Sequence, residues 1–487
     1  MAYKHGVHVS EIPTSVLPPV SVDSAIPFIV GTAPINMTDE KNVNKPVLVY
    51  SYEEAVAAFG YVAPEKEESS GLKKFAFTLC EFINSQFALF GTGPAILVNV
   101  LDPAKHKKTA TTTEIQLDAK TGTATIKEPG IILSSVVVGS YKENEAYTLS
   151  FDSDGYLVVS AVKTKDGFAI PAGETVSFSA DILDPSLVTS EDILGGVDTE
   201  GNKSGLELIA ECFPRFRLVP GLILSPGFDN ATIAAAKAAK AANINGHFSA
   251  LALVDIPTDE VKQYSAAAAW KTDNNVTDPR QIACWPMVAL DGVAFHLSTQ
   301  LAGAIGLTDS ANGGVPYVSP SNQKINATST ILSDGSEVWL SPDTAAALNG
   351  QGIVSALNFI GGWKCWGNRT ATYPGNTDTK DAFIPVRRMF DWVGNTLTQT
   401  FWQKLDGPIN RRFIESIVDS ANIWMNGLVA KQYLLGGKVA FLDTENPTTD
   451  LMDGIVRFHV YLTPPSPARE IDFILEYDPS AFSGLFE

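Results

Sequence analysis

The C-terminal end of this chain reads as a strand that has no sheet of its own. The segment REIDFILEYD (residues 469–478) alternates in polarity, with Ile474 as the one apolar exception on the polar face, and its apolar face carries Ile471, Phe473, Leu475 and Tyr477. A period of two residues predicts a strand with one buried face. Prolines cannot donate to a strand ladder, so this strand is detached from what precedes it by Pro464, Pro465 and Pro467.

The N-terminal end has the same character. Residues 3–20 carry Val7 and Val9 in alternation, followed by Pro13, Pro18 and Pro19. A detached strand at each terminus needs a sheet edge, and in a repeating assembly a neighbouring copy offers that edge. We therefore expect strand exchange between subunits, involving Val7 and Val9 at one end and the apolar face of residues 471–477 at the other.

Composition excludes several classes of protein. With 487 residues, 45% of them hydrophobic and 18% charged, the chain is expected to form two to four soluble domains. It has no apolar run long enough for a membrane helix and no signal-peptide core near its start, so we expect synthesis in the cytoplasm and no membrane insertion. The formal charge of −19 argues against nucleic-acid binding. The spacing of the cysteines predicts buried free thiols, namely Cys80, Cys212, Cys284 and Cys365.

The order of the predicted elements indicates a mixed α/β and α+β, multidomain fold. Strands alternate with helices in residues 23–103 and again in 197–360, which predicts a mostly parallel sheet. Residues 104–196 are rich in Thr, Val and Gly, and their short alternating runs predict an inserted β-sandwich or barrel. Residues 361–465 predict a C-terminal α+β domain, and the arms take residues 1–22 and 466–487.

Several individual elements follow from local signals. Ser51 and Asn230 are expected to cap helices. Residues 72–90 read as one long helix, and residues 259–270 as another. The DSDG sequence at 152–155 predicts a hairpin turn rather than the start of a calcium loop.

Motifs at both ends carry a resemblance to a known family. GVHVSEIPTSVLPPVSVDSAIPFIVGTAP (6–34) resembles the opening of contractile phage tail sheath proteins, of the kind found in myovirus-like phages and prophages. Three later segments resemble the sheath C-terminal region, in family order: WKCWGNRT (363–370), PVRRMFDWVGNTL (385–397) and HVYLTPPSPAREIDFILEY (459–477). Residues 104–196 contain no matching motif.

The resemblance implies a structural role in a virion. A sheath subunit would form six-fold rings stacked in a helical array around an inner tail tube, with baseplate and tail terminator proteins as further partners. Residues 23–103 and 197–360 would then be the α/β sheath domain. Contraction would proceed by rigid-body movement of subunits, drive the tube through the target envelope, and need neither catalysis nor a cofactor. The same fold could serve a phage, a bacteriocin or another injection machine.

An enzyme of the α/β hydrolase or ligand-binding type is the alternative from a different class. Asp255 and Asp291 each end a predicted strand, where ligands bind in α/β sheets. A carboxylate there could be catalytic, but it could equally cap a helix or contact a neighbour. The sequence has no nucleophile elbow, HExxH, CxxC or GxGxxG motif, and we expect no catalytic, cofactor or metal site.

Four arginines stand out in this acidic chain: Arg387, Arg388, Arg411 and Arg412. They could line an ordinary solvated helix face. Combined with the family resemblance, they predict a charged patch that contacts acidic surfaces of neighbouring subunits or of the tube.

Overall fold

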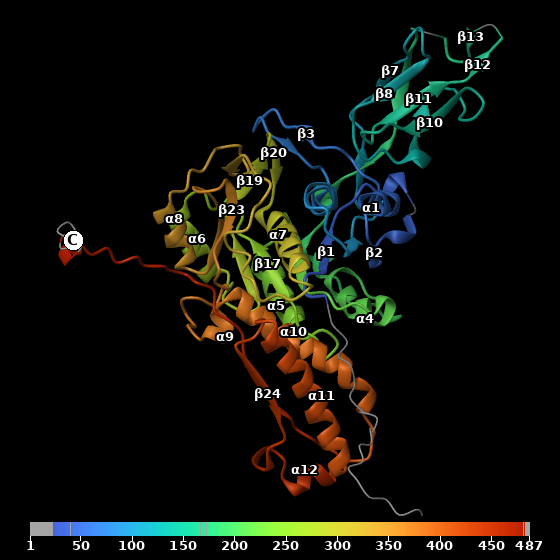
Figure 1. Cartoon of the computed structure of the whole chain (residues 1–487). Coiled ribbons are helices and arrows are strands. Elements are labelled where there is room, and N and C mark those ends of the chain that lie inside the picture. Colours follow the sequence, from blue (N-terminus) through green and yellow to red (C-terminus); the bar gives the residue numbers. More distant parts are fainter. Residues whose placement is uncertain (1–22, 39, 166, 172, 481, 483–487) are drawn as a thin grey trace, which may run out of the picture.

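The computed structural model describes residues 23–482 except 39, 166, 172 and 481. Figure 1 shows a central α/β body, a β-rich lobe projecting from one end, a helical lobe at the other, and a C-terminal segment that runs out from the body. The fold is mixed α/β and multidomain, as predicted. The residue limits expected for each domain stay a prediction.

An eight-stranded sheet forms the centre of the body. Its strand order is β2-β5-β1-β16-β17-β18-β22-β23. The two outermost strands run antiparallel to their neighbours and the inner pairs are parallel. The strands are β2 (Val47–Val49), β5 (Ala95–Asn99), β1 (Pro27–Gly31), β16 (Leu222–Leu224), β17 (Leu251–Asp255), β18 (Gln281–Cys284), β22 (Ile353–Asn358) and β23 (Trp363–Trp366).

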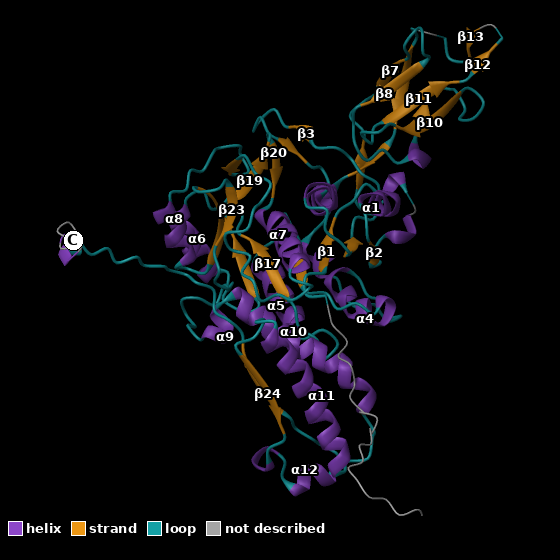
Figure 2. Ribbon diagram, viewed as in Figure 1, coloured by secondary structure: helices purple, strands orange, loops and turns teal. Residues whose placement is uncertain are grey.

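Apolar runs explain why these strands occupy the centre. Every residue of β1, β5 and β17 is buried, because helices cover both faces of the parallel sheet (Figure 2). The helices of the body are α1 (Tyr52–Phe59), α2 (Thr78–Ile83), α3 (Ser190–Leu194), α4 (Ile209–Phe216), α5 (Ala231–Ala242), α6 (Tyr264–Asp273), α7 (Leu297–Ala311) and α8 (Pro342–Asn349).

Two helices of the body begin at the N-caps that the sequence predicts. The Ser51 side chain accepts a hydrogen bond from the Glu54 amide at the start of α1. The Asn230 side chain accepts from the amides of Thr232 and Ile233 at the start of α5. Both predicted N-caps are therefore confirmed.

The long helix predicted over residues 72–90 is wrong. Its first part forms strand β4 (Lys73–Lys74), α2 starts only at Thr78, and a π-helical turn follows from Asn84 to Leu89. Thr78 and Thr32 fix this start, since the amide of each donates to the hydroxyl of the other at 3.1 Å. A contact across 46 residues in sequence thus overrides the local helical pattern.

The helix expected over 259–270 is shifted along the chain. It begins at Tyr264 and ends at Asp273. The preceding residues form a turn in which Val261 is buried, and its carbonyl accepts a hydrogen bond from the indole nitrogen of Trp285.

A second, five-stranded sheet lies beside the first, with the order β21-β19-β20-β4-β3. Because of this second sheet, residues 281–290 divide between two sheets, with β18 in the first and β19 in the second. Its other strands are β3 (Glu65–Lys66), β19 (Met287–Leu290), β20 (Val293–Phe295) and β21 (Ser329–Ile331). Asp291 and Gly292 form the turn between β19 and β20, both with positive φ (49° and 81°), as a two-residue Asp-Gly hairpin requires.

The β-rich lobe has its own small sheets and its own core. Ile131, Val138, Leu157 and Ile170 are buried at its centre. The predicted hairpin turn at residues 152–155 joins β10 to β11 and is confirmed. The strands are β6 (Lys107–Thr109), β7 (Glu114–Gln116), β8 (Thr123–Ile126), β9 (Val137–Val138), β10 (Tyr147–Phe151), β11 (Leu157–Ala161), β12 (Lys163–Thr164), β13 (Gly167–Phe168), β14 (Thr175–Ser179) and β15 (Asp181–Leu183).

The C-terminal lobe combines helices with a two-stranded sheet. Helix α11 packs on strand β24, with Met425, Leu428 and Val439 buried between them. The rings of Trp392 and Trp424 lie 5.6 Å apart and join α10 to α11. The elements are α9 (Thr379–Ala382), α10 (Ile384–Phe401), α11 (Arg411–Ala430), β24 (Gly436–Ala440), α12 (Thr448–Met452) and β25 (His459–Thr463).

Candidate functional site

The segment that follows β25 leaves the body without joining a sheet. Residues 464–478 contain no strand and run out from the body (Figure 1). The apolar side chains beyond the prolines are largely exposed. Their exposed fractions are 71% for Ile471, 86% for Phe473, 94% for Ile474, 95% for Leu475 and 73% for Tyr477. A contiguous apolar run in this setting favours a partner surface. Its pairing with another copy stays a prediction.

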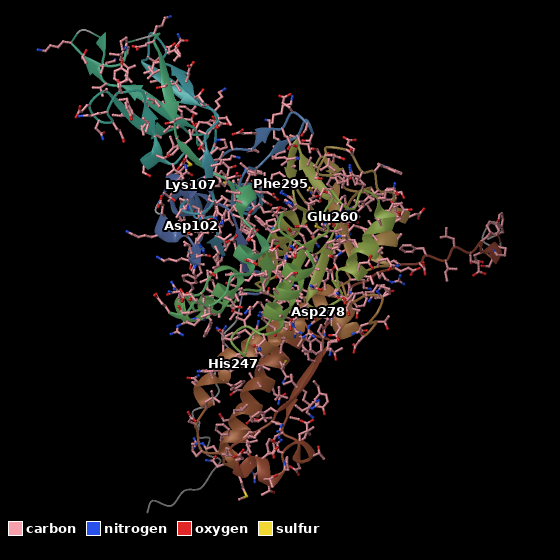
Figure 3. All side chains as sticks on the ribbon, turned by 180° about the vertical axis from the view of Figure 1, so that it is seen from behind. Asp102, Lys107, His247, Glu260, Asp278 and Phe295 are labelled. Carbon is pink, nitrogen blue, oxygen red and sulfur yellow. The ribbon has the colours of Figure 1, made fainter. Side chains whose placement is uncertain are left out.

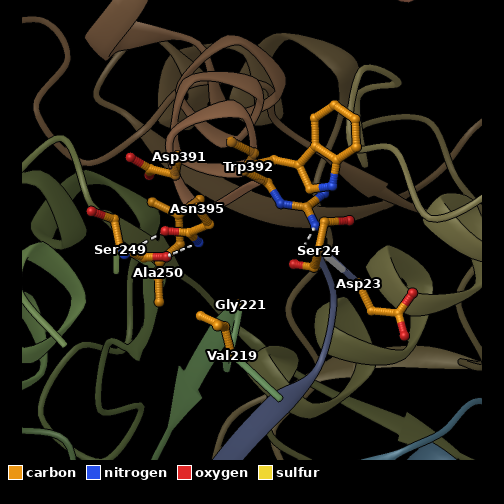
Figure 4. A pocket seen from close by; sticks show the side chains of 11 residues that line it. Asp23, Ser24, Val219, Gly221, Ser249, Ala250, Asp391, Trp392 and Asn395 are labelled. Atoms are coloured by element: carbon orange, nitrogen blue, oxygen red, sulfur yellow. Dashed lines mark hydrogen bonds between the residues drawn. The ribbon is translucent and has the colours of Figure 1, made fainter. Parts of the chain in front are cut away.

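At the N-terminal arm, Val7 and Val9 lie outside the described residues, but the root of the arm is described. The Ser24 hydroxyl donates to the carboxylate of Asp309 at 2.5 Å and also lies 2.9 Å from the carbonyl oxygen of Gly314. Figure 4 shows Asp23 and Ser24, which precede β1, near Val219 and Gly221, which precede β16. The root of the N-terminal arm is therefore fixed to the end of α7.

The predicted arginine patch is wrong for Arg388. This side chain is 3% exposed and forms a bidentate ion pair with Asp309, with Nη1 3.0 Å from one carboxylate oxygen and Nη2 bonded to the other. Nη2 also donates to the carbonyl of Ser24 at 3.2 Å. Arg388 thus joins α10, α7 and the root of the N-terminal arm within one chain, where a neighbouring subunit cannot reach its side chain.

The predicted patch is wrong for Arg387 as well. Its guanidinium pairs with Asp381 at 3.1 Å and with Asp391 at 2.9 Å, and Asp391 also binds Arg280 at 3.0 Å. Burial raises the pKa of Asp391, while the charges of the two arginines oppose that shift. The same physical reason explains both corrections. Helix α10 packs against the body, so its two basic side chains are buried and pair with carboxylates of the same chain.

The other two arginines remain at the surface. Arg411 and Arg412 lie at the start of α11, and the Arg411 side chain is 91% exposed, with Glu415 at 2.7 Å. Their part in contacts between subunits or with a tube stays a prediction.

Further contacts fix the C-terminal lobe to the body. The side chain of Asn395 on α10 donates to the Ser249 carbonyl at 2.8 Å and accepts from the Ser249 amide at 2.9 Å (Figure 4). The His247 ring, labelled in Figure 3 where the body meets the helical lobe, packs edge-on against Trp402 at 4.8 Å. Together with Arg388, these contacts make α10 the connection between the sheet and the lobe.

The two-stranded sheet of the lobe offers places where a further strand could add. Within the described part of the chain, β24 and β25 pair only with each other, from Gly436 opposite Thr463 to Ala440 opposite His459. A neighbouring cavity of about 570 Å³ is bounded mainly by apolar side chains of α10, α11 and the sheet, among them Leu397, Phe401, Phe413, Ile417, Phe458 and Val460. This sheet is the candidate acceptor for an added strand.

Asp255 and Asp291, the two carboxylates considered for an enzyme site, do not share one sheet edge. Asp291 is exposed in the β19–β20 turn. Asp255 ends β17 and is bonded to Ser298, accepting from its amide at 3.0 Å and from its hydroxyl. Asp255 therefore caps the start of α7, the structural role that the sequence had left open.

Other buried charges surround Asp255. Glu81 accepts from the His296 amide at 2.7 Å and lies 2.8 Å from the His296 ring. Burial alone would lower the pKa of His296, but the Glu81 carboxylate raises it to about 9. Burial raises the pKa of Asp255 to about 6, against the opposing charge of His296.

Lys237 and Asp229 complete this cluster. The Lys237 ammonium is fully buried, pairs with Asp229 at 2.5 Å and donates to the Leu253 carbonyl. The sequence predicts neither the Lys237–Asp229 pair nor the His296–Glu81 pair. A signal existed for Lys237, because it occupies the buried face of the alanine-rich α5 with Ile233 and Ala241. No local signal links Glu81 to His296, which is 215 residues away.

The four cysteines are all buried and free, so the prediction of buried thiols is confirmed. None of the described helices is both long and apolar enough to cross a bilayer.

The chain is similar in sequence to several tail sheath proteins. No protein-family model matches it. It is 28% identical to the tail sheath protein of Burkholderia phage BcepMu over 97% of this chain and 96% of that protein. It is also 24% identical to a putative prophage major tail sheath protein of Pseudomonas aeruginosa, over 69% of this chain and 83% of that protein. The tail sheath protein of Escherichia phage P2 is 25% identical over 58% of this chain and 69% of that protein.

Solved structures share the fold. The sheath of an extracellular contractile injection system, in the contracted state, aligns with a TM-score of 0.57 at 14% identity over 99% of both chains. The contracted helical sheath of the anti-feeding prophage aligns with a TM-score of 0.56 at 15% identity, over 98% of this chain and all of that one. The chain is thus a homologue of the tail sheath proteins of contractile phages, and the resemblance carried by its terminal motifs is confirmed.

Proposed function

We propose that this chain is the sheath subunit of a contractile tail, polymerising as stacked hexameric rings around an inner tube. The subunits move nearly as rigid bodies to a contracted lattice, and this movement drives the tube through the target envelope. The observation that carries the proposal is the match to a phage tail sheath protein along almost the whole of both chains.

The C-terminal arm supports assembly through strand exchange. Ile471, Phe473, Leu475 and Tyr477 expose an apolar face that nothing in the isolated subunit covers among the described residues. Each such side chain contributes roughly 1.5–3 kcal/mol when fully buried, so four give roughly 6–12 kcal/mol of gross stabilisation per arm. A neighbour's β24–β25 sheet, with its apolar surroundings, is the proposed acceptor. Val7 and Val9 of another neighbour would add from the opposite end.

Rigid-body movement requires a subunit that holds its shape while its contacts change. The buried Arg388–Asp309 pair and the Asn395–Ser249 bonds fix the C-terminal lobe to the central sheet. The long α10 carries all of these contacts on the lobe side. We propose that body and lobe move together and that the arms provide the flexible connections.

The proposed partners are further copies of this chain, an inner tail tube protein, and baseplate and terminator proteins at the two ends. Arg411 and Arg412, exposed at the start of α11, are the proposed charged contacts to a neighbour or to the tube. We propose a role without catalysis, in a virion assembled in the host cytoplasm. The polar cluster around Asp255 supports this view, since its carboxylates stabilise the start of α7.

Truncation of the arm tests the function directly. We expect the purified full-length chain to form tubular polymers visible by negative-stain electron microscopy. A chain that ends at Pro467 should remain folded, because the arm contributes nothing to the described core, and should form no tubes. The proposal is wrong if the full-length chain stays a monodisperse monomer at high concentration and moderate salt.

A further inference from the structure

A groove lies beside the point where the C-terminal arm leaves the body. It is lined by residues from 317–323, from the end of α8 (346–350), from 366–373 and from the start of the C-terminal arm, Pro465–Arg469, and it encloses about 600 Å³. We call it the arm-root groove. Its lining combines aromatic rings, side-chain amides and two arginines, which are groups suited to binding an extended peptide.

Arg369 is the fixed cation of this groove. The central carbon of its guanidinium lies 3.7 Å from the ring centre of Phe383 and 4.3 Å from that of Tyr373. Ring contacts of this kind hold the planar group in one orientation and leave its N–H donors free. No carboxylate of the described residues pairs with Arg369, although its side chain is partly buried.

The surroundings of the groove add positive charge. Lys324 directly follows the lining residue Gln323 and is paired with Lys364 in a backbone bridge, and Lys364 donates to the side chain of the lining residue Asn322 at 2.8 Å. In the part of the chain that the structure describes, neither lysine has a carboxylate partner. Among the described residues, the one acidic partner of Arg469 is its exposed neighbour Glu470.

This arrangement is unusual for the protein as a whole. The chain has 54 acidic residues and a net charge of −19. Yet no acidic side chain stands among the described residues that line the groove. Elsewhere, buried arginines such as Arg388 have carboxylate partners within the chain, so unpaired cations at a concave surface indicate a partner that brings the carboxylates.

We propose that the arm-root groove binds an acidic, extended segment of a second copy of this chain, with Arg369 as the residue that receives its carboxylate. The inference rests on the proposed function, because it needs copies to meet in a polymer. A second copy is the favoured partner because its surface is strongly acidic, and because the groove adjoins an arm already proposed to reach a neighbour.

Charge reversal tests the groove with a matched control. Arg217 likewise lies over an aromatic ring, with its guanidinium carbon 5.8 Å from the ring centre of Phe213, but it is exposed and lies outside the groove. We expect Arg369→Glu to raise the concentration at which polymers form by about tenfold, the size expected for one lost charge-assisted contact. Arg217→Glu should leave it unchanged, and Arg369→Lys should have an intermediate effect.

A crosslinking experiment keeps the test valid if Arg369→Glu fails to fold. A photoreactive benzoylphenylalanine in place of Asn322, an exposed residue of the groove, should give a covalent dimer within polymers. Mass spectrometry should place the other end on an acidic segment of a second copy. The groove inference is overturned if polymers form but crosslinks stay within one chain or reach a segment without acidic residues.

The outcomes separate the two proposals. If the wild-type chain forms no polymers, the proposed function fails and the groove inference falls with it. If polymers form normally but Arg369→Glu and Arg217→Glu behave alike, only the groove inference fails.

Discussion

Replacing Arg388 with methionine should lower the free energy of unfolding of the isolated subunit, independently of any effect on assembly. The substitution leaves the Asp309 carboxylate, whose side chain is 3% exposed, without its ion-pair partner, and removes the bond to the Ser24 carbonyl. Removing one partner of a buried pair typically costs about 3–5 kcal/mol, because the remaining charge stays buried and uncompensated. We expect a loss of that size in the free energy of unfolding.

Urea unfolding followed by tryptophan fluorescence measures the effect. The double variant Arg388→Met with Asp309→Leu should recover at least half of the loss, since it leaves no unpaired charge. Arg411→Gln is the matched control: it removes an arginine from an ion pair at the surface, and we expect no measurable change in the unfolding midpoint. A loss below about 1 kcal/mol for Arg388→Met, or a double variant less stable than the single one, would refute this reasoning.

Three other predictions concern assembly and pH. Phe473→Asp should leave the melting temperature of the subunit unchanged and abolish tubes in micrographs; normal tubes would contradict strand exchange. Replacing residues 104–196 with a short linker should leave a soluble chain that still polymerises, as checked by circular dichroism and light scattering; a remainder that does not fold would show that the β-rich lobe belongs to the core. Because the folded-state pKa of His296 is about 9 and its ordinary value is 6.5, the folded state holds more protons between these values. Stability should therefore fall by about 2 kcal/mol from pH 6.5 to 8, and His296→Gln should remove this fall.

Local features of the fold were predictable from sequence, and long-range ones were not. Ser51 and Asn230 cap helices within three residues of themselves, so their role can be read from a short window. The break in the predicted helix over 72–90 depends on Thr32, and no window around Thr78 contains that partner.

The candidate functional site likewise has features that the local sequence predicted and features that depended on distant residues. The alternation of residues 471–477 predicted an apolar face, and the described chain leaves that face exposed. The role of Arg388 depended on Asp309, 79 residues away, and on Ser24, 364 residues away. A basic pair in an acidic chain favoured a surface contact, but side-chain charge alone cannot distinguish an external carboxylate from an internal one.

The burial of every native thiol makes this subunit ready for site-specific labelling. Each cysteine is at most 1% exposed, and burial raises the pKa of Cys80 and of Cys365 to about 12. Maleimide dyes react with accessible thiolates, so the folded wild-type chain should take up almost no dye. A single cysteine introduced at Glu476 would then be the one reactive thiol of the folded subunit. Fluorescence from that position could follow the arm from free subunit to polymer without first removing any native cysteine.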